Sequence, residues 1–244
     1  MNRSAFVALS AAALAATGQS ASAAPSLPTA VGGVAMPDTA AARAALALAT
    51  ASEDPHVLRH SLRSFYFGSL IGAKLGVAYD PQTLFVACTL HDLGLSPDHA
   101  TPHARFEIDG ADAARATLIA GGASAEDARR AWDAVTLHAI YGIAKFKEPE
   151  VRLASAGIIT DVGAAFVKLL DAGAVRDVLA TFSRKGFNDA FVGALTDYAK
   201  RKPDTVGGSF FEDIAVKTIH GYKIGSFSDE MAAGDAFAAL GFTI

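Results

Sequence analysis

The sequence predicts an all-α protein, and three features of the chain support that prediction. Alanine-rich apolar segments show helical spacing, whereas runs of β-branched residues are rare. Helix start and stop signals, such as Asp80-Pro81 and Gly94, delimit these segments. No hairpin signal, internal repeat or glycine-rich phosphate loop is apparent. We therefore expect helices alone to build the core.

Length and composition limit the class of protein. The chain has 244 residues, 51% of them hydrophobic, and a formal net charge of -4, which suits one compact domain of ordinary size. The largest basic cluster, Lys200-Arg201-Lys202, is interpreted as a solvated helix end. We therefore expect no nucleic-acid partner and a small-molecule substrate. Both a monomer and a homo-oligomer stay open.

Residues 1–23 have the layout of an export signal. Asn2-Arg3 gives a basic start, residues 5–16 are apolar but too short to span a membrane, and Ala21-Ser22-Ala23 resembles a cleavage site. We expect cleavage after Ala23, a periplasmic or secreted location, and no stable membrane association of the mature chain. An uncleaved amphipathic anchor is the weaker alternative, because the segment has almost no polar face.

The rest of the chain is predicted to contain a linker and one helical domain. Residues 24–37 are rich in Pro, Gly and Ala and are predicted to be the linker. Residues 38–244 form the domain, with its core at 55–170. Its first helices are expected at 39–51, with Asp38 as the cap, and at 55–76.

Further helices follow in order along the chain. The segment from Asp80 to Gly94 is predicted as a helix, and residues 95–106 as a loop over the site. Helices are then expected at 107–121, at 124–138 with Ser124 as the cap, and from 148 to about 165. The C-terminal extension is predicted to hold helices at about 175–185, 188–201, 211–221 and 229–240.

His91 and Asp92 are adjacent in an otherwise apolar helical stretch. With Leu84 and Cys88 they fall on one stripe, which should face the core. Cys88, the only cysteine, cannot form an internal disulfide and is interpreted as a small core residue. Burying an unpaired carboxylate is costly, and a metal ion would satisfy both polar side chains. Taken alone, such a pair is more often a capped or solvent-touching pair.

Four residues on apolar stripes of three predicted helices are candidate metal ligands: His60, His91, Asp92 and Asp161. Imidazole and carboxylate groups are ligands for zinc, iron or manganese. A metal ion held by three or four such protein ligands keeps one coordination position for water. A histidine bonded to a backbone carbonyl is the alternative for His60. A partner of Arg63 is the alternative for Asp161.

Other polar residues are candidates for chemistry around the metal. Arg63 could orient Asp92 or hold substrate, or simply pack its stem. Glu107 could carry a proton or orient a ligand histidine, although stabilisation by a helix N-terminus is the commoner explanation. His138 is predicted to face the pocket. His103 would reach the cluster only if a second metal is bound.

The chain has a histidine, then an adjacent His-Asp pair, then a distant aspartate. This order of residues resembles the motif of the HD-domain metal-dependent hydrolases. The resemblance covers about residues 56–165. Within it, short sequence motifs are similar to those of the cyanamide-hydratase branch: residues 60–68 (HSLRSFYFG), 105–115 (RFEIDGADAAR), 137–144 and 149–151. It implies an HD-domain-like helical bundle with a divalent ion between helices. Its ligands would be His60, His91, Asp92 and Asp161, with zinc the first expectation and iron or manganese the alternatives.

The resemblance implies a hydratase-like activity. Metal-activated water would attack a nitrile such as cyanamide to give urea, with His138 or Glu107 moving the proton. A phosphohydrolase, with Arg63 or Lys145 neutralising phosphate, is the second hypothesis. A two-iron oxygenase, with His103 and His138 as extra ligands, is the third. A binding protein with a degenerate metal site is the alternative from another class.

Overall fold

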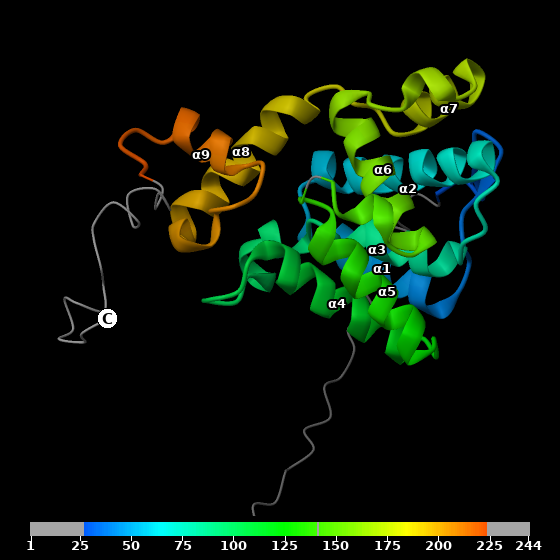
Figure 1. Ribbon diagram of the computed structural model, residues 1–244, viewed down its shortest axis with the longest axis horizontal. Helices are drawn as coiled ribbons and strands as arrows, with labels where there is room; N and C mark the ends of the chain where they lie inside the picture. Colours follow the sequence, from blue (N-terminus) through cyan, green and yellow to red (C-terminus); the bar gives the residue numbers. More distant parts are fainter. Residues whose placement is uncertain (1–26, 141, 224–244) are drawn as a thin grey trace, which may run out of the picture.

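The computed structural model describes residues 27–140 and 142–223, and this part of the chain is almost entirely helical (Figure 1). The all-α prediction is confirmed. None of the helices in these ranges is both long and apolar enough to cross a membrane. The predicted signal at 1–23 and the predicted helix at 229–240 lie outside the described residues.

Most of the helices begin where the sequence predicts them. Asp80 and Ser124 act as the predicted caps, accepting hydrogen bonds from the backbone N–H groups of Thr83 and Asp127. The helices of the described part are α1 (Ala40–Ser52), α2 (Pro55–Leu75), α3 (Pro81–Leu90), α4 (Phe106–Ala120), α5 (Ala125–Leu137), α6 (Pro149–Gly163), α7 (Ala172–Thr181), α8 (Phe187–Arg201) and α9 (Glu212–Thr218).

The start of the described chain differs from the prediction. Two short strands, β1 (Ala30–Val31) and β2 (Val34–Ala35), form an antiparallel hairpin within the predicted linker. The signal that was overlooked is Gly32-Gly33, because both residues have positive φ, 57° and 82°, as a tight two-residue turn requires. The α1 cap is also different, since Thr39 rather than Asp38 accepts the hydrogen bond from Ala42.

Helix α3 ends at Leu90, not at the predicted stop Gly94. After it, Leu93–Leu95 forms a 3-10 turn. A side-chain carbon at Gly94 would collide with the backbone of Phe106, so the glycine permits a close approach to the start of α4. His91 and Asp92 therefore lie at the end of α3, where the chain turns.

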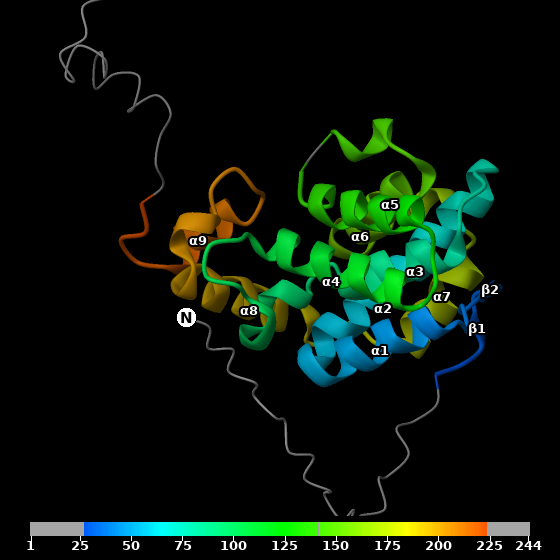
Figure 2. The same cartoon turned by 90° about the horizontal axis from the view of Figure 1, so that it is seen from below.

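Helix α2 lies in the middle of the bundle and packs along α6, with α3, α4 and α5 beside them (Figure 1). Helices α8 and α9 lie to one side (Figure 2). There they form a second apolar cluster with the start of α4, built around the aromatic residues Phe106, Phe187, Phe191, Tyr198 and Phe211. The C-terminal extension is thus packed against the end of the bundle that carries His60 and His91.

Candidate metal centre

Three buried side chains from two helices meet at one point. His60 belongs to α2, whereas His91 and Asp92 follow the last residue of α3. The two histidine Nε2 atoms are 3.2 Å apart. Oδ2 of Asp92 lies 3.2 Å from Nε2 of His91 and 3.8 Å from Nε2 of His60. Among the described residues, this is the group of side chains whose ligand atoms converge closely enough to hold an ion.

The hydrogen bonds of the two histidines fix which ring nitrogen carries the proton. Nδ1 of His91 donates to the carbonyl oxygen of Cys88 at 2.8 Å, and a carbonyl can only accept. Nδ1 of His60 donates to the carboxylate of Asp161 at 2.7 Å. In their neutral forms, both imidazoles therefore present the lone pair of Nε2 to the same point, as metal-binding imidazoles do.

A cation fits this arrangement. Two facing lone pairs and a carboxylate repel one another unless a proton or a metal ion lies between them. Oδ2 of Asp92 is also buried, and among the described residues it has no hydrogen-bond partner. Ligands at about 2.0–2.2 Å in a tetrahedral site would lie roughly 3.3 Å apart, close to the separations found here. The donor set suits zinc, iron or manganese.

The titration behaviour of these groups agrees with a site for a cation. Burial acts to raise the pKa of Asp92, but the neighbouring histidines His91 and His60 lower it to about 2. Burial lowers the pKa of His60. For His91 burial also acts to lower the pKa, but the charge and hydrogen bond of Asp92, together with the carbonyl of Cys88, outweigh it and raise the pKa. The carboxylate is therefore charged and deeply buried, and it needs a positive partner.

The structure places Asp161 beside this centre, on the far side of His60. Its carboxylate accepts from Nδ1 of His60 and, in bidentate fashion, from Arg63 at 2.7 and 2.8 Å. No Asp161 oxygen belongs to the converging group. Asp161 therefore orients a ligand histidine, the role often taken by a carboxylate behind a metal-bound imidazole. This differs from the predicted direct ligation and matches the alternative in which Asp161 pairs with Arg63.

The prediction for Arg63 is corrected. Its side chain is fully buried beneath Asp161, and Nη1 donates to the carbonyl oxygens of Phe182 and Ser183 at 3.1 Å. With both ends of its guanidinium engaged, Arg63 neither orients Asp92 nor reaches a substrate. It neutralises Asp161 in a dry environment, where an unpaired carboxylate would be costly.

The prediction for Glu107 is also corrected. Its carboxylate is bound by Arg105 through Nη2 at 2.6 Å and through Nε at 3.3 Å. Glu107 is buried and is not part of the converging group. Its ion pair with Arg105 therefore has a structural role at the start of α4.

His138, by contrast, lies where a pocket role requires it. Its ring is edge-on to His91, with ring centres 4.8 Å apart, and its Nε2 is 3.9 Å from Oδ1 of Asp92. Nδ1 donates to the carbonyl oxygen of Val135 at 2.5 Å. Burial and the nearby His91 lower the pKa of His138 to about 3, so the ring is neutral at neutral pH. His103, the other residue required by a two-metal centre, is an exposed loop residue.

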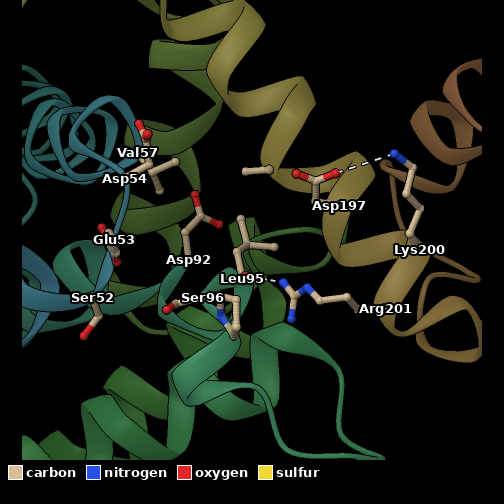
Figure 3. Close-up of a pocket in the computed structure, with 12 residues that line it drawn as sticks. Ser52, Glu53, Asp54, Val57, Asp92, Leu95, Ser96, Asp197, Lys200 and Arg201 are labelled. Atoms are coloured by element: carbon tan, nitrogen blue, oxygen red, sulfur yellow. Dashed lines mark hydrogen bonds and ion pairs between the residues drawn. The ribbon is translucent and has the colours of Figure 1, made fainter.

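A cavity of about 480 Å³ leads to Asp92 from one side. Figure 3 shows Glu53, at the junction of α1 and α2, on one side of Asp92 and residues of α8 on the other. Sequence reasoning did not single out Glu53, because Glu53-Asp54-Pro55 also has the form of an ordinary helix start. It also missed Asp197 and Arg201, since only the packing of α8 brings them to this cavity.

The comparison with protein families agrees with this fold and centre. The model of the HD domain matches residues 57–172, from the first turn of α2 to the first residue of α7. This stretch therefore matches the HD domain, which supports a place in the HD superfamily of metal-dependent hydrolases. A search of the curated proteins found no match. The resemblance at the level of the superfamily is confirmed, and the segments outside the match, including α8 and α9, are not covered by it.

Proposed function

We propose that this protein is an exported, metal-dependent enzyme that adds water to a small, uncharged, nitrile-type substrate such as cyanamide. One observation supports metal dependence above all. The Nε2 atoms of His60 and His91 and the Oδ2 of Asp92, which has no hydrogen-bond partner among the described residues, converge at one buried point. His60, His91 and Asp92 would hold the ion, with Asp161 orienting His60.

A divalent ion in such a site supplies the acidity that makes water nucleophilic near neutral pH. The side chains of this chain supply the rest. Asp161 and Cys88 hold the two ligand imidazoles in the required tautomer. His138 presents the unprotonated Nε2 to the other face of Asp92, where it can accept a hydrogen bond from water or substrate.

The charges around the larger cavity support an uncharged substrate. Carboxylates predominate in its lining, because Glu53, Asp54 and Asp197 join Asp92 there, with only two cations, Lys200 and Arg201. Each of these cations already has a partner. Nζ of Lys200 is 3.6 Å from Asp197, and Nη2 of Arg201 donates to the carbonyl oxygen of Leu95 at 2.7 Å. An anionic phosphate would meet more negative than positive charge here.

A separate observation favours a phosphohydrolase as the second candidate. On its other side, His138 lines a smaller cavity of about 140 Å³ together with Lys145 and Arg152, and no carboxylate is among its lining residues. A phosphate group could be neutralised there by the two cations. Lys145 was a predicted phosphate contact, whereas Arg63, the other one, is buried beneath Asp161.

Metal analysis of the mature protein, combined with two turnover assays, tests the proposal. We expect about one divalent ion per chain and release of urea from cyanamide. Hydrolysis of bis(4-nitrophenyl) phosphate without urea release would favour the phosphohydrolase. A bound metal without turnover of either compound would favour a binding protein with a degenerate enzyme site.

A further inference from the structure

Glu53 is held rigidly between two helices at the wall of the larger cavity. Its backbone N–H ends α1 by donating to the carbonyl oxygen of Ala49 at 2.9 Å. The next residue, Asp54, begins α2 by accepting from the N–H of His56 at 2.7 Å. The backbone at Glu53 is therefore positioned by two helix ends rather than by a loop.

The carboxylate of Glu53 is only partly satisfied. Oε2 accepts a long hydrogen bond, 3.4 Å, from the hydroxyl of Ser61. Oε1 is shielded from solvent and has no hydrogen-bond partner among the described residues. Burial, reinforced by the negative charge of Asp92, raises the pKa of Glu53 well above its ordinary value. A group in this state exchanges a proton more readily near neutral pH than an exposed glutamate does.

The other carboxylates of the same cavity are committed to different contacts. Asp54 caps α2, and Asp197 pairs with Lys200 on the exposed side of α8. Asp92 belongs to the candidate metal centre. His138 lines the smaller cavity instead. On the side of the larger cavity, Glu53 is thus the carboxylate that is near Asp92 and still has an unused oxygen.

We propose that Glu53 is the catalytic acid–base residue of this site, receiving and returning a proton at Oε1. This role, which the sequence suggested for Glu107, rests on the proposed function only in that the site adds water to a substrate. As the water oxygen bonds to the electrophilic carbon or phosphorus, its O–H bond breaks and Oε1 takes the proton. The proton then passes to the substrate nitrogen or oxygen that gains the electron pair, and Glu53 returns to a carboxylate.

The variant Glu53→Gln tests this role, since it keeps the size of the side chain but removes the proton-accepting oxygen. The control is Asp213→Asn, which removes one negative charge from an exposed ion pair with Lys217 on α9, outside the lining of both cavities. Metal content, KM and kcat are measured for both with cyanamide and with bis(4-nitrophenyl) phosphate. We expect E53Q to keep its metal and its KM while kcat falls by about 10²–10⁴ on whichever compound the native protein turns over. D213N should stay within about threefold of the native kcat, because an exposed pair contributes little.

A second measurement does not depend on turnover. Infrared titration of the metal-free protein should show the C=O band of a protonated carboxylic acid that persists to higher pH than the band of an exposed glutamate, because burial raises the pKa of Glu53. E53Q should abolish this band and D213N should retain it. An unchanged band in E53Q, or native kcat in E53Q, would overturn the role of Glu53. So would loss of metal in E53Q, or an equal loss of turnover in D213N. If the native protein turns over neither compound, the proposed function fails, and absence of the band from the infrared titration would still overturn the proposal for Glu53.

Discussion

Gly157 on α6 lies directly against the carbonyl oxygen of Ser64 on α2, where a side-chain carbon would collide with that backbone. Ser64 is one helical turn beyond His60, and Gly157 is one turn before Asp161. The close approach of the two helices therefore brings Asp161 within 2.7 Å of Nδ1 of His60. A packing feature of the core thus sets the orientation of a candidate metal ligand.

Replacing Gly157 with alanine should affect both stability and the metal centre. The added methyl group must push α6 away from α2, and overpacking of this kind costs about 1–3 kcal/mol. We expect denaturant unfolding to show that loss and metal titration to show weaker binding. The control is Gly193→Ala on α8, where a side-chain carbon meets nothing within 4 Å. That variant should be neutral or more stable by up to about 1 kcal/mol. Native stability in G157A would contradict the close approach.

Removing the metal should lower the melting temperature of the mature protein. The three converging residues connect α2 with the end of α3, so one ion would tie these segments together. Binding to the native state alone stabilises it by about 2.7 kcal/mol at a hundredfold excess over the dissociation constant. Calorimetry before and after chelation measures the shift, and readdition of the ion should reverse it. An unchanged melting curve with the metal shown to be gone would count against the centre.

Two substitutions should separate metal binding from chemistry. Asp92→Asn removes the charge of a converging oxygen, and we expect loss of both metal and turnover. His138→Ala should keep the metal, because its Nε2 is 3.9 Å from Asp92 and outside the converging group. Its turnover should fall by about 10²–10⁴ if the imidazole takes part in proton transfer. Parallel loss of metal and activity in H138A would instead indicate a centre with two metals.

Asp161 should make stability depend on acid pH. Burial acts to raise its pKa, but His60 and Arg63 lower it to about 2, below the value of about 3.9 for an unfolded chain. The native state therefore binds this proton less well than the unfolded state. The contribution is complete above about pH 4 and is lost as the pH falls towards 2, and by linkage it amounts to roughly 2–3 kcal/mol.

Unfolding of the metal-free protein between pH 5 and pH 2 checks this dependence. Asp161→Asn should be less stable at neutral pH and should lose less stability on acidification than the native chain. Asp177→Asn, at an exposed position on α7, serves as the control and should follow the native curve. Equal acid dependence in D161N and the native protein would show that the pair with Arg63 contributes nothing measurable.

Export should remove residues 1–23. The basic start, the short apolar stretch and Ala21-Ser22-Ala23 predict that the mature chain begins at Ala24. N-terminal sequencing of protein recovered from the periplasm or the medium measures this directly. Exported protein that still begins at Met1 would disprove the cleavage.

The sequence by itself determined the helical class, most helix starts and the pair His91-Asp92. These depend on local physics: caps such as Asp80 and Ser124 satisfy the free N–H groups of a first turn, and apolar spacing shows which face is buried. The helix end at Gly94 was wrong because the close approach of Phe106 overrides the local pattern. The hairpin was missed although Gly32-Gly33 is itself a local turn signal.

Only the tertiary structure decided how the polar residues divide their roles. Asp161 on α6 is far along the chain from His60 and Arg63 on α2, and the sequence leaves several pairings open. Packing of α2 on α6 buried Arg63 against Asp161, and the energetic cost of an unpaired buried charge then fixed both side chains behind His60. Other contacts between distant segments, such as those of α8 with α2, placed Glu53 and α8 around Asp92, because such contacts arise from the folded chain and not from local spacing.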